Sequence, residues 1–204
     1  DYGIGHPLYN ASHQGANQDA GITPMLHRLL AKRGLYVTDI HNAARTGARL
    51  AFVSGGYNAM NQVNGSPDAA YFDAKTSRGK IIVIIVGAND ALSQTSTIDT
   101  TVRAALNTML DYCDAAGFEK IVLCTVPDAS GAPGIGNSAA LSLARTIEIN
   151  AVYAEEAALR NNVSICDLYS AMGPYSATKM ADDGLHPSKY TSAQVWAPAL
   201  LNSV

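Results

Sequence analysis

Three groups of polar residues in this 204-residue sequence have types and spacings suited to acyl transfer. The segment "DDGLHPS" places Asp183 three residues before His186, a spacing at which a carboxylate can orient an imidazole. A histidine oriented in this way is a general base for a hydroxyl nucleophile. The other two groups are "NAARTG", which ends at Gly47, and "GAND", which contains Asn89. A glycine N–H and an asparagine amide are donor types that stabilise an oxyanion.

Each group also has a simpler interpretation when taken alone. Asn89 could cap a helix or form an Asx-turn, and Gly47 could serve an ordinary turn. His186 could be a surface histidine in a loop. The three groups nevertheless each follow a predicted strand, and ligands in parallel sheets gather at the carboxyl ends of strands. Their joint occurrence therefore favours the catalytic interpretation.

Short apolar runs predict the strands that would position these groups, at residues 35–40, 81–86, 121–126 and 163–168. The run "IIVIIV" is apolar at every position, which is typical of a strand covered on both faces in a parallel sheet. Helix patterns alternate with the runs, and we place them over residues 23–33, 102–116 and 138–160 and after residue 186. This alternation predicts a three-layer α/β/α sandwich with a mostly parallel sheet.

Individual helix signals predict where the first three helices begin, end or bury a face. Thr23 is a suitable cap for the first helix, which would end before Gly34, and the second would stop at Gly117. In the third helix, five residues form a stripe that we expect to be buried: Leu143, Ile147, Ala151, Ala154 and Ala158. The three cysteines form no CxxC pair and no zinc set, so we interpret them as buried thiols: Cys113, Cys124 and Cys166.

Bulk composition narrows the class of protein. The sequence is 48% hydrophobic and 15% charged, which is typical of a globular domain, and its length predicts one domain over residues 1–204. A net charge of −3 gives no reason to expect a nucleic-acid partner. The longest apolar run, 81–86, is too short to span a bilayer, so no membrane insertion is expected. A flavodoxin-like nucleotide or flavin binder is a further candidate, but no glycine-rich phosphate loop supports it.

The order and spacing of these groups resemble the SGNH (GDSL) hydrolase superfamily of serine esterases and lipases. In that family Gly-Asp-Ser follows the first strand, and later blocks carry a glycine, Gly-x-Asn-Asp and Asp-x-x-His. The resemblance implies a flavodoxin-like sheet of about five strands and hydrolysis of carboxylic esters through an acyl-enzyme, without metal or organic cofactor. It implies that His186 is the general base and that Asp183 orients it. It also implies that Gly47 and Asn89 form the oxyanion hole together with the N–H of the nucleophile.

The sequence departs from the family pattern at the nucleophile, because it contains no Gly-Asp-Ser. Asp1 and the "YGIG" after it look like the remains of that block, so the resemblance implies a serine beside Asp1. Three explanations stay open: the 204-residue chain starts just after the serine, the serine is chemically modified, or this family member has lost its nucleophile. Ser12 and Ser54 are the nearest alternative nucleophiles, but neither directly follows a strand pattern.

The resemblance leaves the substrate broad, since the family acts on acetylated sugars, aryl esters, lysophospholipids and thioesters. We expect a small-molecule or carbohydrate ester with a short acyl group, particularly O-acetyl on carbohydrate. The alternative is a non-catalytic binding module that kept the esterase shell without a nucleophile. Compartment and oligomeric state are left open.

Overall fold

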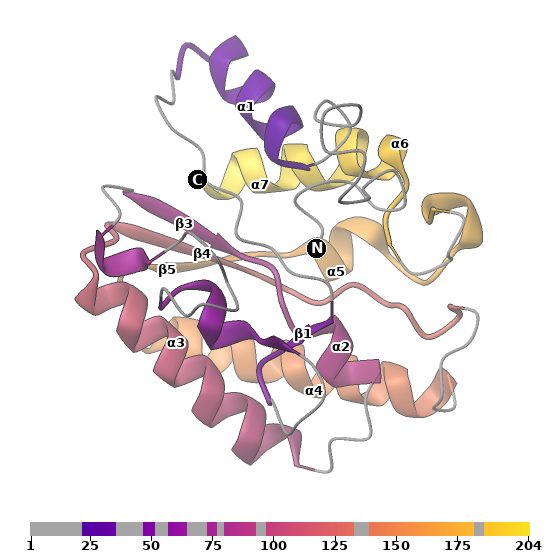
Figure 1. The fold of residues 1–204 in the computed structure, drawn as a ribbon. Coiled ribbons are helices and arrows are strands. Elements are labelled where there is room, and N and C mark those ends of the chain that lie inside the picture. The colour runs from indigo at the N-terminus through magenta and orange to yellow at the C-terminus, as the bar shows by residue number, and fades with distance from the viewer. Residues whose placement is uncertain are drawn as a thin grey trace.

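The main sheet contains three parallel strands in the order β3, β4, β5 (Figure 1). The computed structural model describes residues 22–35, 47–51, 57–64, 73–76, 80–92, 97–132, 139–181 and 186–204. The strands are β3 (Ile81–Ile84), β4 (Lys120–Cys124) and β5 (Val163–Cys166), and they occupy three of the four predicted runs. Nearly all of the fourth run, 35–40, lies outside the described residues, so the five-stranded sheet stays a prediction. A separate parallel pair joins β1 (Ala48–Arg49) to β2 (Tyr57–Asn58).

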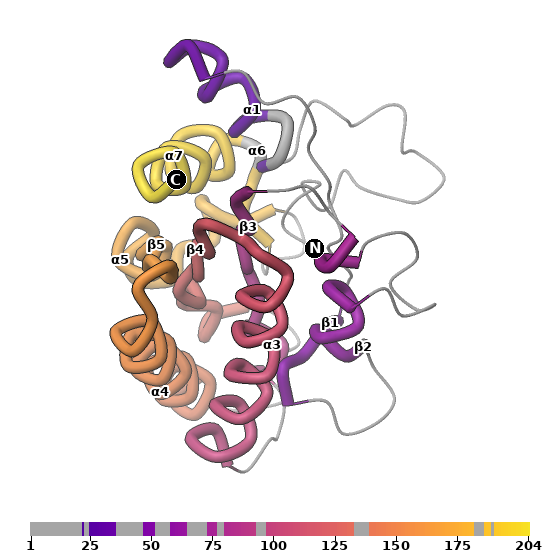
Figure 2. The backbone as a smooth tube through the Cα atoms, turned by 90° about the vertical axis from the view of Figure 1, so that its left-hand side faces the viewer, coloured from indigo at the N-terminus to yellow at the C-terminus, as the bar shows by residue number. Residues whose placement is uncertain are grey.

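Helices follow the strands and cover both faces of the sheet. The α-helices are α1 (Ile22–Lys32), α2 (Ala88–Leu92), α3 (Arg103–Ala115), α4 (Ala139–Ala158), α5 (Leu168–Met172), α6 (Lys189–Thr191) and α7 (Ala197–Ser203). Short π-helical turns, Ile98–Val102 and Ser192–Trp196, lead into α3 and α7. In Figure 1, α3 and α4 lie on one side of the sheet, and α1 and α7 lie on the other. Figure 2 shows the same layers from the side, and β1 lies beside α2 in Figure 1.

Residues of β4 alternate between two hydrophobic clusters, one on each face of the sheet. Ile121 and Leu123 join the cluster of α3 and α4, whereas Val122 and Cys124 join the cluster of α1, α5 and α7. All four side chains are fully buried, because a parallel strand between two helical layers has no solvent-facing side. The fold is therefore α/β with the predicted α/β/α order of layers.

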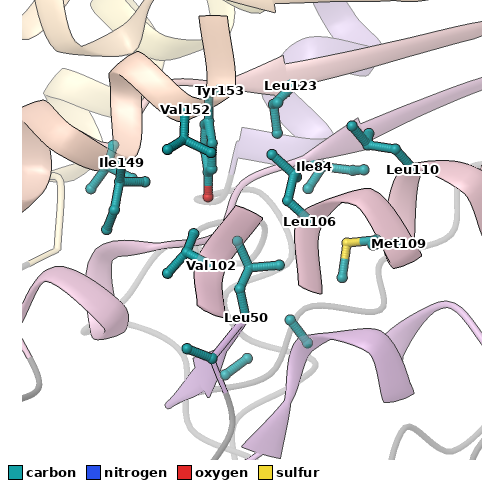
Figure 3. Packing of buried hydrophobic residues seen from close by; sticks show 14 of the residues in the cluster. Leu50, Ile84, Val102, Leu106, Met109, Leu110, Leu123, Ile149, Val152 and Tyr153 are labelled. Carbon is teal, nitrogen blue, oxygen red and sulfur yellow. The ribbon is translucent and has the colours of Figure 1, made fainter. Parts of the chain in front are cut away.

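Buried hydrophobic side chains from α3 and α4 form one cluster with those of β3 (Figure 3). Leu106 and Leu110 from α3 pack with Ile149 and Tyr153 from α4, and all four are fully buried. Burying each large apolar side chain stabilises the fold by about 1.5–3 kcal/mol. The Tyr153 hydroxyl donates a hydrogen bond of 3.0 Å to the carbonyl oxygen of Val86, so its polar end is satisfied.

The buried face of α4 differs from the predicted stripe, and that prediction was wrong. Leu143 is half-buried, and four members of the stripe are exposed: Ile147, Ala151, Ala154 and Ala158. The buried residues instead are Ser142, Thr146, Ile149, Val152, Tyr153, Glu156 and Ala157. Polar residues occupy this face because local bonds satisfy them: the Thr146 hydroxyl donates to the carbonyl of Ser142, and two arginines bind Glu156.

Helix ends follow the glycine signals in the sequence. α1 ends before Gly34, and α3 ends before Gly117, as predicted; both glycines have positive φ. α1 begins at Ile22, one residue before the predicted cap Thr23, which is within the ordinary spread of helix boundaries.

All three cysteines are free and buried, as predicted. Cys124 and Cys166 are register partners on neighbouring strands. A hydrogen bond from the Cys124 thiol lowers the pKa of Cys166 to about 7, and burial raises the pKa of Cys124 well above its ordinary value. Burial also raises the pKa of Cys113, to about 12. The cysteines are thus part of the core.

Candidate functional site

The structure brings Asn89 close to residues 47–51, the Gly47 loop. The Asn89 side-chain amide donates a hydrogen bond of 3.2 Å to the carbonyl oxygen of Ala48, the residue that follows Gly47. Gly47 has φ +76°, a left-handed conformation that glycine adopts without strain, and it leads directly into β1. Two sequence blocks separated by about 40 residues are therefore joined at one place.

Gly87 lets the chain turn from β3 into α2, where Asn89 lies. Its φ is +105°, which side-chain-bearing residues rarely adopt. A Cβ at this position would lie 2.6 Å from the Tyr153 hydroxyl oxygen and 2.7 Å from Cγ2 of Val126. The turn that presents Asn89 therefore requires glycine both for its backbone conformation and for space.

Asp90, next to Asn89, is fully buried and binds the backbone of the same loop. Its Oδ2 accepts from the N–H of Leu50 at 3.0 Å, and its Oδ1 accepts from the N–H of Ala51 at 2.8 Å. Burial raises the pKa of Asp90, although these N–H groups and the charge of Arg49 act in the opposite direction. The role of Asp90 was not predicted from the sequence, where the only signal is its place after Asn89.

His186 is buried, with 8% of its surface exposed, and backbone contacts hold it and Pro187 against residues 180 and 181. Its carbonyl oxygen accepts from the N–H of Ala181 at 2.8 Å, and Pro187 forms an antiparallel bridge with Met180. Beyond the bridge, the hydroxyl of the buried Thr191 donates to the carbonyl of Lys179 at 2.6 Å. These contacts fix the ends of the segment that carries the Asp-x-x-His motif.

Several predicted residues fall outside the part of the chain that the structure describes. Asp183 lies in the segment 182–185, so its pairing with His186 stays a prediction. The segment from Asp1 to residue 21, with Ser12, and the segment 52–56, with Ser54, are also outside it.

His186 and Asn89 lie at the same, carboxyl-terminal edge of the sheet. Pro187, adjacent to His186, lines a small cavity with residues 127–129, which follow the end of β4. Asn89 follows the end of β3, and β3 and β4 are parallel neighbours. The arrangement places the proposed base and an oxyanion donor type at the edge where α/β sheets bind ligands.

Two further aspartates follow strands at this edge and were missed by the sequence analysis. Asp128, after β4, accepts from the N–H groups of Ser130 at 2.9 Å and Tyr175 at 3.0 Å. Asp167, after β5, accepts from the Thr125 hydroxyl at 3.0 Å. Burial opposes the charge on both, but the hydrogen bonds outweigh it and lower both pKa values. Asp128 thus connects Ser130 to Tyr175, and Asp167 connects the segments that follow β4 and β5.

The described residues provide no group of three or more histidine, cysteine or acidic side chains that could hold a metal ion. Within the same part of the chain, no helix is long and apolar enough to cross a membrane.

Comparisons with known proteins identify the family and the fold of the chain. The model of the GDSL-like lipase/acylhydrolase family matches residues 3–192. A crystal structure of a carbohydrate esterase family 3 from Talaromyces cellulolyticus is similar at 15% identity, with a TM-score of 0.58, covering 88% of this chain and 86% of that chain. A crystal structure of an acetyl esterase mutant with acetate ion is similar at 17% identity, with a TM-score of 0.59, covering 89% of each chain. No curated protein sequence matches the chain. At these identities the two structures establish likeness of fold.

Proposed function

Because the chain belongs to the GDSL-like lipase/acylhydrolase family, we propose that it is a serine esterase that hydrolyses carboxylic esters through an acyl-enzyme. The contact between Asn89 and Ala48 is the observation that carries the proposal. It places an amide donor beside the Gly47 loop at the carboxyl edge of the sheet. That pairing of donor types suits stabilisation of an oxyanion.

Each residue has a defined role in the proposed reaction. His186 removes the proton from the serine hydroxyl, and the oxygen attacks the ester carbonyl to give a tetrahedral intermediate. The Gly47 N–H and the Asn89 amide bind its oxyanion; one Asn89 N–H donates to the carbonyl of Ala48, and the role of oxyanion donor falls to the second. His186 then protonates the leaving alcohol and later activates the water that hydrolyses the acyl-enzyme. Asp183 orients the imidazole throughout.

The proposed nucleophile is a serine beside Asp1. The segment from Asp1 to Gly5 resembles the remains of the family's nucleophile block, which supports this position. A fluorophosphonate should add once to the natural-length protein, and peptide mapping should locate the adduct at that serine. Labelling at Ser12 or Ser54 would refute the assignment. A natural-length protein that takes up no label and hydrolyses no ester would favour the binding module instead.

The proposed substrate is a short-chain ester, in particular an O-acetyl group on carbohydrate. Two proteins of similar fold are described as a carbohydrate esterase and an acetyl esterase, which supports this choice. The test compares kcat/KM for acetyl and octanoyl esters of one phenol, together with acetate release from an acetylated oligosaccharide. Preference for the octanoyl ester, or no acetate from the oligosaccharide, would contradict the substrate class and leave the esterase assignment intact.

A further inference from the structure

Asp90 binds two main-chain N–H groups of the segment that follows Gly47. Both carboxylate oxygens accept N–H groups, one from Leu50 and one from Ala51, and no part of the side chain is exposed to solvent. The neighbouring Asn89 binds the carbonyl of Ala48 in the same loop. Two consecutive residues of α2 therefore hold the short segment that follows Gly47.

The contacts of Asp90 are of a strong type. A hydrogen bond to a charged group is roughly twice as strong as one between neutral groups. Burial raises the pKa of Asp90, so a carboxylate here carries a desolvation cost that a neutral residue would avoid. Burying a carboxylate therefore costs free energy, and a precise position of the segment that it binds would justify this cost.

We propose that Asp90 is a positioning residue for the ester hydrolysis: its carboxylate fixes the distance between the Gly47 N–H and the Asn89 amide. The inference rests on the proposed function, because these two donors must meet one oxyanion. Such donors act at about 2.7–3.1 Å from the oxyanion, so a small shift of the Gly47 loop weakens them. Asp90 itself touches the loop and has no role with substrate.

The primary test replaces Asp90 by its neutral isostere in the natural-length protein. Asp90→Asn offers one acceptor oxygen and turns an NH2 group toward one of the two backbone N–H groups. We expect kcat on a short aryl ester to fall by roughly 10- to 100-fold, less than the 10²–10³ loss of a whole oxyanion donor. KM should change little, because the oxyanion interaction is made only in the transition state.

Glu156→Gln is the matched control, since it also replaces a buried carboxylate by an amide. Glu156 binds Arg103 and Arg160, away from the proposed oxyanion hole. Both variants should lose thermal stability, but only Asp90→Asn should lose kcat. Should Asp90→Asn fail to fold, Asp90→Ser gives the same comparison, because it keeps one acceptor without an added NH2 group.

Two measurements separate positioning from a general loss of structure. In the double variant Asn89→Ala/Asp90→Asn, the fold-decrease in kcat should be far smaller than the product of the decreases in the two single variants. Both changes act on one oxyanion hole, so their effects should not be independent. Amide hydrogen exchange of Leu50 and Ala51 should accelerate in Asp90→Asn and stay unchanged in Glu156→Gln. Losses that multiply, or unchanged exchange, would overturn the positioning role alone. A wild-type protein without esterase activity would overturn the proposed function, and this inference with it.

Discussion

Glycine at position 87 determines how Asn89 is presented, and its replacement is the first residue-scale prediction. Gly87→Ala should destabilise the protein by about 2–4 kcal/mol, because the new Cβ would overlap the Tyr153 hydroxyl and Val126 at an unfavourable φ. Gly117→Ala is the matched control: its φ is +84°, but no atom lies within 4 Å of the added Cβ. That variant should cost only about 1 kcal/mol, from backbone strain alone. Urea denaturation of both variants measures the difference, and equal losses would contradict the steric argument.

Replacement of the proposed base and oxyanion donor should have separable effects on turnover. His186→Ala should lower kcat by roughly three or more powers of ten, as in other triads. Asn89→Ala should lower kcat by about 10²–10³, the usual loss for one oxyanion donor. Steady-state kinetics on a short aryl ester give both values. Near-normal turnover in the His186 variant would identify another group as the base.

The sequence proposed Gly47, Asn89 and His186 because each stands in a motif whose chemistry can be read locally, and their catalytic roles stay predictions. The role of Asp90 could not be read in this way. Its partners are backbone N–H groups about 40 positions earlier, and a backbone group has no signature in the sequence. Asp128 was missed for the same reason, since one of its partners is the N–H of Tyr175.

At the scale of elements, α4 offers a direct test of which face is buried. Ile149→Ala should cost about 2–5 kcal/mol, because its fully buried side chain would leave a cavity beneath the helix. Ile147→Ala should change stability by less than about 0.5 kcal/mol, because Ile147 is 52% exposed. Thermal unfolding of the two variants compares the same substitution on opposite faces. A larger loss at Ile147 would restore the stripe predicted from the sequence.

Strands β3, β4 and β5 were predictable because short, mostly apolar runs between helix patterns are typical of buried strands in a parallel sheet. The buried face of α4 was not predictable from apolar residues, since it includes Thr146 and Glu156. A charged side chain is buried only when partners satisfy it, and the partners here come from outside the helix or from its end. Apolar periodicity therefore located the helix but selected the wrong face.

At the scale of the molecule, Glu156 connects α3 and α4 through Arg103 and Arg160, with N–O distances of 2.8 Å and 3.0 Å. Burial opposes the charge of Glu156, but hydrogen bonds from the two arginines outweigh it and lower its pKa below 4.5. A lowered pKa contributes stability that is complete above the unfolded value of 4.5 and is lost as the pH falls through the folded value.

Glu156→Gln should therefore make the free energy of unfolding depend less on pH. The wild type should lose more unfolding free energy than the variant between about pH 6 and about pH 3. At the higher pH the variant should be weaker by about 1.5–3 kcal/mol, the value of hydrogen bonds to a charged group. Urea unfolding at both pH values measures this, and Asp111→Asn, which removes an exposed partner of Arg160, is the control. Parallel pH curves for wild type and Glu156→Gln would contradict the argument.

The three buried thiols can report how fast the folded protein opens. Cys113, Cys124 and Cys166 are at most 1% exposed, so a thiol reagent meets them only when the surrounding layers separate. Cys124 and Cys166 belong to one cluster and Cys113 to the other, so the reagent samples both faces of the sheet. When a chromogenic disulfide is present at saturating concentration, the rate of colour development should equal the rate of unfolding. The two faces would report a common rate if they open together and separate rates if one layer detaches first.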